Sequence, residues 1–328
     1  MPVNKHPGFT ITVDLDQEKQ NIKSNPRRKE IPKRSQDNLL IASWNLCNLG
    51  AKGQRRDPED LVLMAEIMKP FDLIAAQEIR DDYGEFETVV KKMGSKYDFL
   101  MTDRAGNDER LAFIYKTTRV QRTQLAGELV VPTTLPLQII KKQRQRTYEI
   151  GVGQFDRNPY MCSFAAGDFT LTLVNVHIYY GAKSGKKFMR RMAEVYGLAK
   201  WAHDRRTESR DKTFDHDLIL IGDFNIPKLA DNDFVSTQLR AFGMQPTNHS
   251  SFQGSNLDGR EQFDQIAFHP GETKDRFTGK SGVYDYDGTL FRQKIWDDPA
   301  YSEAQFHAYL RHHISDHRPI WSEWHCQR

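Results

Sequence analysis

The sequence predicts an α/β fold built from layered sheets, and two observations indicate it. Short apolar runs alternate with segments of helical periodicity, and no internal repeat interrupts the alternation. No linker-like stretch interrupts residues 39–328, so we expect a single domain there. Hydrophobic residues make up 38% of the 328 residues and charged residues 28%, which is typical of a globular protein and excludes a fibrous or disordered chain.

Residues 1–38 differ in composition from the rest of the chain. They are polar and punctuated by proline, and residues 23–34 carry a run of basic side chains. We interpret this segment as a basic, flexible N-terminal arm, with a loose contact to phosphates as the alternative. The alternating residues 9–13 could instead add an edge strand.

From residue 39 onward, strands and helices are expected in turn. The predicted strands are residues 39–44, 73–76, 111–115, 170–177, 218–222, 263–268 and 319–324, and the predicted helices are residues 57–68, 84–93, 186–203 and 231–242. The first helix has a typical start, with Asp57 as N-cap, Pro58 in the first turn and acids near the positive end of the helix dipole. Residues 271–313 show no clear alternation, and we expect a long loop with a helix over residues 302–311.

Polar side chains stand at the boundaries of five predicted strands. They are Asn45, Glu78, Asn175 with His177, Asp223 with Asn225, and Asp316 with His317. Each one alone could be a cap, a turn or a solvated loop residue. Apolar strands that end in such groups, however, place them together at one rim of a sheet, where open α/β folds bind ligands.

These residue types suit the cleavage of a phosphoester. That reaction needs a hard cation beside the phosphate, a positioned water and a proton for the leaving oxygen. Carboxylates such as Glu78 and Asp316 suit Mg²⁺ or Mn²⁺. Asp223 could orient the water, Asn225 could hold the water or the phosphate, and histidine transfers protons near neutral pH.

Six motifs stand in this order along the chain: WNLCNLG, AAQEIRD, VNVHIYY, LIGDFNIP, FDQIAF and SDHRPIW. The series spans residues 44–321 and resembles the successive motifs of the endonuclease/exonuclease/phosphatase superfamily, which has the DNase I-like fold. The resemblance implies a four-layer sandwich of two packed mixed β-sheets flanked by helices. It also implies hydrolysis assisted by a divalent metal, here Mg²⁺ or alternatively Mn²⁺. By the same resemblance, Asn45 and Glu78 hold the metal, and Asp316 assists His317 or a second metal.

The resemblance also implies the catalytic roles. His177 acts as general acid or phosphate ligand, Asp223 activates the water and Asn225 positions it. Asp264 orients His317, which contacts the scissile phosphate. An acid beside a histidine is also the expectation from chemistry, because the carboxylate fixes the tautomer and stabilises the cation.

Four basic residues are candidates for contact with the substrate phosphate. Arg110 precedes a predicted strand and resembles a phosphate-contacting position of the DNase branch, although an exposed arginine is the alternative. Lys183, Lys186 and Lys187 follow closely after His177 and could track a polyanion backbone, unless they form a solvated helix start.

The leading functional hypothesis is a metal-dependent phosphodiesterase, a nuclease that hydrolyses DNA with metal-activated water. A phosphatase or phosphodiesterase of a small-molecule or lipid phosphoester is the first alternative, because fold does not fix substrate and the net charge is only +3. A non-catalytic binding protein on the same fold is the second. The chain has three distant cysteines without a Cys-x-x-Cys pair and no apolar N-terminal signal, so we expect a cytoplasmic protein. It has no apolar run of membrane-spanning length, so we expect no membrane partner.

Overall fold

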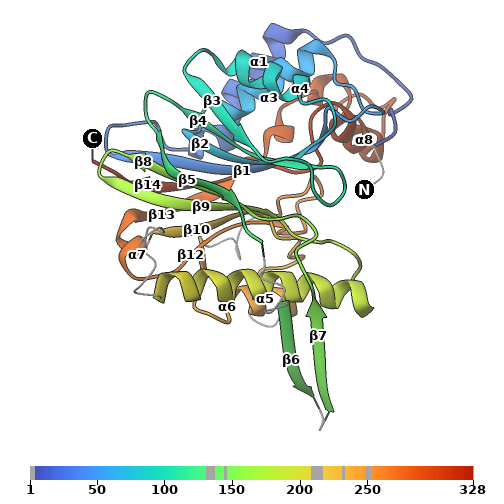
Figure 1. The fold of residues 1–328 in the computed structure, drawn as a ribbon. Coiled ribbons are helices and arrows are strands. Elements are labelled where there is room, and N and C mark those ends of the chain that lie inside the picture. The colour runs from blue at the N-terminus through green and yellow to red at the C-terminus, as the bar shows by residue number, and fades with distance from the viewer. Residues whose placement is uncertain are drawn as a thin grey trace.

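Two six-stranded sheets lie face to face with helices on both outer sides (Figure 1). The structure is a computed structural model that describes residues 4–130, 137–143, 146–207, 217–230, 233–247 and 253–327. Because two sheets pack face to face between outer helices, the predicted four-layer α/β sandwich is confirmed. Residues 231–232, at the start of one predicted helix, lie outside the described residues.

The first sheet has the strand order β13-β14-β1-β2-β4-β3. Its strands are β1 (Asn38–Leu49), β2 (Leu73–Ile79), β3 (Tyr97–Met101), β4 (Arg110–Lys116), β13 (Phe277–Val283) and β14 (Ile320–His325). The pair β1 and β2 is parallel, whereas β14 runs antiparallel to β1. The carboxyl ends of β1 and β2 therefore meet at one edge of the sheet.

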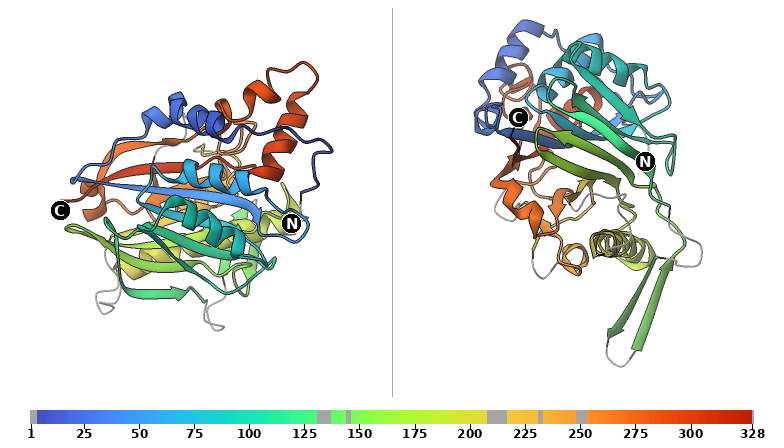
Figure 2. Two further views of the ribbon diagram at one scale, coloured as in Figure 1. Left: turned by 90° about the horizontal axis from the view of Figure 1, so that it is seen from above. Right: turned by 60° about the vertical axis from the view of Figure 1, so that its left-hand side comes forward.

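The second sheet has the order β11-β12-β10-β9-β8-β5. Its strands are β5 (Gln121–Glu128), β8 (Tyr160–Ala166), β9 (Phe169–His177), β10 (Leu218–Asp223), β11 (Gln245–Pro246) and β12 (Asp264–Phe268). A separate hairpin of β6 (Leu137–Gln143) and β7 (Arg146–Val152) projects away from the sandwich (Figures 1 and 2).

Helices cover the outer face of each sheet. They are α1 (Leu15–Ser24), α2 (Pro26–Glu30), α3 (Pro58–Met68), α4 (Gly84–Met93), α5 (Gly185–Thr207), α6 (Phe234–Arg240), α7 (Glu272–Arg276) and α8 (Glu303–His313), with short 3₁₀ turns at Tyr286–Gly288 and Arg292–Lys294. In Figure 1, α1, α3, α4 and α8 lie over the first sheet, and α5 and α6 lie under the second. None of the helices among the described residues is long and apolar enough to cross a membrane.

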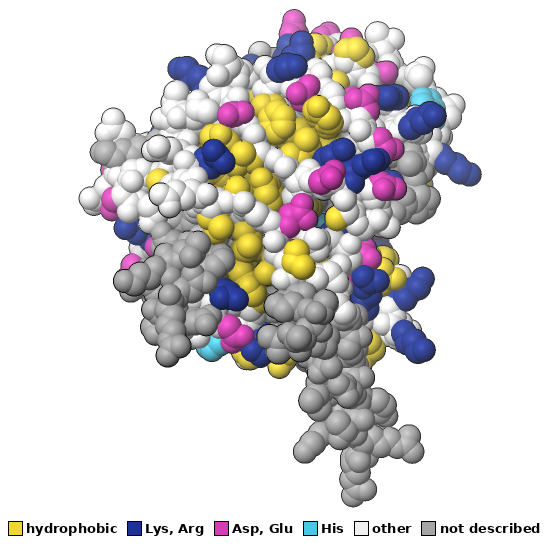
Figure 3. Space-filling view, viewed as in Figure 1, with side chains coloured by type: hydrophobic (Ala, Val, Ile, Leu, Met, Phe, Trp, Pro, Cys, Tyr) yellow, Lys and Arg dark blue, Asp and Glu magenta, His cyan; other side chains and the backbone are white. Residues whose placement is uncertain are grey.

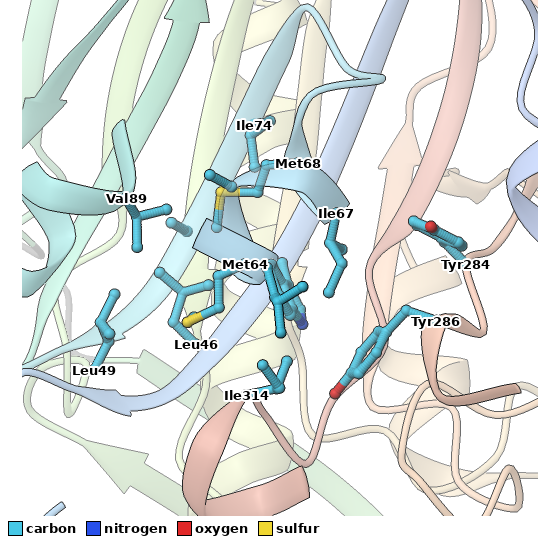
Figure 4. Close-up of a cluster of buried hydrophobic side chains, with 14 of the residues drawn as sticks. Leu46, Leu49, Met64, Ile67, Met68, Ile74, Val89, Tyr284, Tyr286 and Ile314 are labelled. Atoms are coloured by element: carbon cyan, nitrogen blue, oxygen red, sulfur yellow. The ribbon is translucent and has the colours of Figure 1, made fainter. Parts of the chain in front are cut away.

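The central strands are apolar on both faces because each face of each sheet is covered. In β1, Leu39 and Ile41 join the core between the sheets, whereas Leu40 and Trp44 join the core beneath the outer helices. Figure 4 shows part of that outer core, where side chains of β1, β2, α3 and α4 meet Tyr284, Tyr286 and Ile314. A core of this kind on either side of β1 fixes the strand and therefore the direction in which its end points.

The N-terminal segment packs on the sandwich where the sequence predicts a flexible arm. Asp14 caps α1 by accepting a hydrogen bond from the backbone N–H of Gln17. Ile22 on α1 is fully buried and Ile31 nearly so, and both belong to the outer core of the first sheet. Residues 9–13 form no strand and instead contribute partly buried side chains to the same core.

The hydrophobic patterns of the sequence do not predict every strand, and β5 and β13 show the physical reason. In β5 the side chains alternate between exposed and half-buried, and β13 has exposed residues and two glycines, so neither forms an apolar run. Both strands lie at a sheet edge, where pairing with a neighbour rather than burial defines the strand. On the face seen in Figure 3, charged side chains of both signs lie around a band of hydrophobic side chains.

Gly222, the penultimate residue of β10, stands where the structure has no room for a side chain. Its φ of +139° is disfavoured for other residues, and a Cβ there would lie 2.1 Å from the backbone oxygen of Val176. We therefore expect Gly222→Ala to lower the free energy of unfolding by at least about 2 kcal/mol in urea denaturation.

Gly94→Ala is the matched control, because Gly94 also has a positive φ (+120°) but a Cβ there has open space. This variant should show only backbone strain, about 1 kcal/mol. Equal losses in the two variants would contradict the close approach of β10 and β9.

Candidate active site

Five strands deliver polar side chains to one edge of the sandwich. In the second sheet, Asp223 at the end of β10 is in register with His177 on β9 and with Asp264 on β12. In the first sheet, Asn45 on β1 is in register with Gln77, which precedes Glu78 on β2. The two sheets thus present their polar strand ends toward each other, as the sequence predicts for a ligand site.

Asp223 is at the centre of this group and is almost completely buried. Its Oδ2 atom lies 3.5 Å from Nε2 of His177 and 3.9 Å from Nε2 of His317. The same oxygen accepts a hydrogen bond of 3.1 Å from Nδ2 of Asn45, and Oδ1 accepts one of 2.8 Å from the backbone N–H of Asn225. One carboxylate therefore joins residues from four segments of the chain.

His317 is held by a buried carboxylate on the side away from the cavity. Its Nδ1 atom lies 2.7 Å from Oδ2 of Asp264, as the predicted pairing of these residues requires. Burial alone lowers the pKa of His317, but the carboxylates of Asp264 and Asp223 outweigh it and raise that pKa well above its usual value. The two carboxylates therefore favour the protonated imidazole, with Nε2 facing Asp223.

Ser315 fixes the backbone that carries His317. Its hydroxyl donates to the backbone oxygen of Asn45 at 2.7 Å and accepts from the N–H of His317 at 3.0 Å. The indole N–H of Trp44, in the outer core, donates to the backbone oxygen of His317. The packed core therefore sets the position of this imidazole directly.

His177 has an equivalent partner that the sequence analysis missed. Its Nδ1 atom lies 2.7 Å from Oε2 of Glu109, and Oε1 of Glu109 accepts a hydrogen bond of 2.7 Å from the buried Arg157. Burial and the charge of Arg157 lower the pKa of His177, but the carboxylates of Glu109 and Asp223 prevail and raise it. Glu109 is 68 residues away in sequence, and no local pattern marks it.

Glu78 occupies a strained position at the end of β2. Its φ is +60°, and Cys47, Asn48 and Asn225, also at this edge, share positive φ values near 50–60°. Its carboxylate accepts hydrogen bonds of 3.0 Å each from Nδ2 of Asn45 and from the backbone N–H of Asn48. Burial and the nearby charge of Glu109 raise the pKa of Glu78. Strained backbone that the surrounding structure holds in place is common at functional sites.

The cavity above these residues has a volume of about 390 Å³. The residues that line it are Asn4, Cys47, Asn48, Glu78, Tyr180, Asp223, Asn225, Asn256, Leu257, Asp258, Glu261, Phe263, Arg311, Asp316 and His317. Asp316 lies on its wall with one third of its side chain exposed, and one of its oxygens is 3.4 Å from Nε of Arg311. It is outside the two tight clusters, Glu78–Glu109–His177 and Asp223–Asp264–His317, whose ligand atoms lie within 4.8 Å of one another.

The four predicted phosphate contacts are not among the residues lining this cavity. Arg110 donates to the backbone oxygen of Arg80 at 2.7 Å and lies over the ring of Tyr83. Lys183 is 81% exposed and lies 3.9 Å from Glu261. Lys186 and Lys187 are exposed in the first turn of α5.

The donor set fits a hard divalent cation. Glu78 and Asp223 supply carboxylate oxygens that converge from two strands, within 3.8 Å of Nε2 of His177. The amide of Asn45 bridges the same two carboxylates through Nδ2, while its oxygen accepts the N–H of Cys47 at 2.9 Å. Asn45 therefore spaces the carboxylates in this structure.

Residues 42–317 match the Endonuclease/Exonuclease/phosphatase family. No curated protein shows significant sequence similarity to the chain. Several solved structures share its fold at low sequence identity.

A mannosyl-6-phosphatase of Bacteroides thetaiotaomicron is 16% identical at a TM-score of 0.54, covering 87% of this chain and 99% of its own. TDP2 of D. rerio in complex with a single-strand DNA product is 15% identical at 0.51, covering 88% and 98%. The human Nocturnin catalytic domain with bound sulfate is 12% identical at 0.52, covering 92% and 98%. Because the family match spans most of the chain and includes the polar strand ends described above, the protein belongs to the endonuclease/exonuclease/phosphatase family and is a phosphoester hydrolase.

Proposed function

We propose that this protein is a divalent-metal-dependent phosphodiesterase that hydrolyses DNA. One observation carries the proposal: two imidazole Nε2 atoms face the same carboxylate, that of Asp223, at 3.5 and 3.9 Å. Each of these imidazoles, His177 and His317, has its other nitrogen fixed by a buried carboxylate. Two oriented imidazoles and one carboxylate around a single point suit a phosphodiester that is attacked by water.

The residues then divide the reaction between them. Asp223 accepts the proton of the attacking water, and the backbone of Asn225 holds its Oδ1 in place. Asn225 itself is fixed because its Nδ2 donates to the backbone oxygen of Ile178 at 2.7 Å. His317 contacts a phosphate oxygen and His177 donates its proton to the leaving oxygen, so that the diester and water give a monoester and an alcohol.

Glu78 is the principal metal ligand in this proposal, with Asn45 positioning it and Asp316 on the adjacent wall. Carboxylate oxygens suit Mg²⁺, with Mn²⁺ as the alternative. When bound, the ion would neutralise charge on the phosphate.

Three observations favour DNA as the substrate. Tyr180 and Phe263 line the cavity with their rings edge to face, 6.0 Å apart, and aromatic walls can stack on bases. The exposed lysines at positions 183, 186 and 187 lie just beyond Tyr180 in the chain. The similar TDP2 structure contains a single-strand DNA product.

A small-molecule phosphoester is the second candidate. Asp258 and Glu261 on the cavity wall would repel a long polyanion, and the carboxylate of Glu261 already faces Lys183. The similar mannosyl-6-phosphatase acts on a sugar phosphate by its name. The filled set of polar positions gives no support to a binding protein without catalysis.

A substrate panel distinguishes these candidates. With Mg²⁺ or Mn²⁺ we expect cleavage of plasmid and single-stranded DNA that is lost in EDTA and in Asp223→Ala. Asp168→Asn is the control, because Asp168 lies in the turn before β9, at the opposite end of that strand, and pairs with Arg276 there. Hydrolysis of sugar phosphates or bis-p-nitrophenyl phosphate with DNA left intact would contradict the DNA proposal and favour the second candidate.

Glu109→Gln tests the assignment of His177 as the proton donor. Glu109 raises the pKa of His177, so its removal should let His177 lose its proton at lower pH. A general acid must be protonated, so activity falls as pH rises through its pKa. We therefore expect the alkaline limb of the kcat profile to move to lower pH in Glu109→Gln. Glu128→Gln, on β5, should leave the limb in place, and an unmoved limb in both variants would contradict the assignment.

A further inference from the structure

Three histidines gather at a place separate from the catalytic clusters. His6 precedes α1, and His312 and His313 end α8. One ring nitrogen of each lies within 4.8 Å of the others, and the ring centroids of His6 are 5.1 Å from His312 and 6.2 Å from His313. None of the three lines the catalytic cavity.

Two of these rings have a buried nitrogen that the described residues do not satisfy. Nδ1 of His312 and Nε2 of His313 have no hydrogen-bond partner, although the two residues are only 5% and 3% exposed. A buried polar atom without a partner is costly and rare, so such atoms indicate an unseen ligand. His6 is exposed, and its Nδ1 accepts the N–H of Gly8 at 3.1 Å. Its Nε2 atom is therefore the nitrogen that can bind a ligand.

The other ring nitrogen of His313 is held by a carboxylate, as is usual for histidines that bind metals. Its Nδ1 atom lies 2.7 Å from Oδ2 of Asp60, which is 1% exposed. That oxygen also accepts the backbone N–H of Asp57 at 2.9 Å, so the start of α3 holds the carboxylate in place. A carboxylate on one ring nitrogen fixes the tautomer and strengthens the other nitrogen as a ligand.

We propose that His6, His312 and His313 bind a divalent transition-metal ion, with Zn²⁺ as the best fit. Three neutral imidazoles form a set that suits zinc, whereas the oxygen-rich catalytic cavity suits Mg²⁺. Tetrahedral zinc needs ligand nitrogens about 3.3 Å apart, closer than the 4.8 Å limit of the cluster. His6 lies on an exposed segment without regular secondary structure, so its imidazole can approach the other two when the ion binds.

Such an ion would join the N-terminal segment to α8 beside the catalytic cavity. Asn4, two residues before His6, lines that cavity; its N–H donates to Gln54 and its Nδ2 to Sγ of Cys47, each at 3.0 Å. The chain leads from His313 at the end of α8 into Asp316 and His317. The ion would therefore fix Asn4 on the cavity wall. This site does not depend on the proposed function.

Zn²⁺ titration by calorimetry, in excess Mg²⁺, tests the proposal. We expect one site in the parent protein, at least about tenfold weaker binding in His6→Ala, and a smaller rise of Tm with Zn²⁺ in His6→Ala than in the parent. His6→Ala alters an exposed residue, and circular dichroism checks that it remains folded. His307→Ala is the matched control, since His307 is on α8 but pairs with Asp258 outside the cluster.

Glu78→Gln separates this site from the catalytic one, and it should leave Zn²⁺ binding unchanged. Unaltered binding in His6→Ala, or binding lost in Glu78→Gln, would assign the ion elsewhere and overturn the proposal. The absence of any Zn²⁺ site in the parent protein would overturn it as well.

Discussion

Asp223→Asn is expected to lower kcat for phosphodiester hydrolysis by about a thousandfold with little change in KM. The substitution preserves shape, and the asparagine oxygen can still accept the N–H of Asn225. It removes the charge that faces the imidazoles of His177 and His317, and it removes the group that takes the proton from water. Steady-state kinetics with metal present measures the effect.

The control for Asp223→Asn is again Asp168→Asn, which should retain the parent kcat. Circular dichroism and thermal denaturation establish that both variants are folded. A loss of less than about tenfold in Asp223→Asn would show that this carboxylate does not take part in the chemistry.

His317→Gln is expected to lower kcat by about a hundredfold or more. The variant keeps a polar side chain but loses the imidazole whose pKa Asp264 and Asp223 raise. Asp264→Asn should retain more activity, because the imidazole remains. Its alkaline limb should move to lower pH, since without Asp264 the imidazole loses its proton at lower pH.

The pH profiles of the two variants and of His269→Gln provide the check. His269 follows β12 at the end opposite Asp264, and its replacement should leave the profile unchanged. An Asp264→Asn profile that matches the parent profile would contradict the orienting role of Asp264.

The sequence predicts best the strands that are buried on both faces. In β9 and β10, Leu173 and Ile221 point between the sheets while Val174 and Leu220 face the helical layer, so both strands read as apolar runs. Their polar ends stand out against those runs, and this contrast identified Asp223 and His177. Elements such as β5 and α1 depend on neighbours distant in the chain, and local patterns do not show them.

The site residues at strand ends were predictable from the sequence. Their hydrogen-bond partners were not, because only the folded chain brings those partners beside them. Glu109 contacts His177 only after a short bridge between Ala105 and Glu109 turns the chain. Asn45, which the family resemblance predicts as a metal ligand, has its amide between the carboxylates of Glu78 and Asp223, a contact that only the folded chain creates. The contacts of the N-terminal segment with α8 likewise join residues some 300 positions apart.

The central claim is that one cluster of side chains binds a divalent ion and hydrolyses phosphodiesters. The most direct test titrates Mg²⁺ against the rate of bis-p-nitrophenyl phosphate hydrolysis by the parent protein and by Glu78→Gln. We predict saturable, metal-dependent hydrolysis in the parent and at least about tenfold more Mg²⁺ for half-maximal rate in the variant. Hydrolysis that persists in EDTA, or identical titrations of the two proteins, would contradict it.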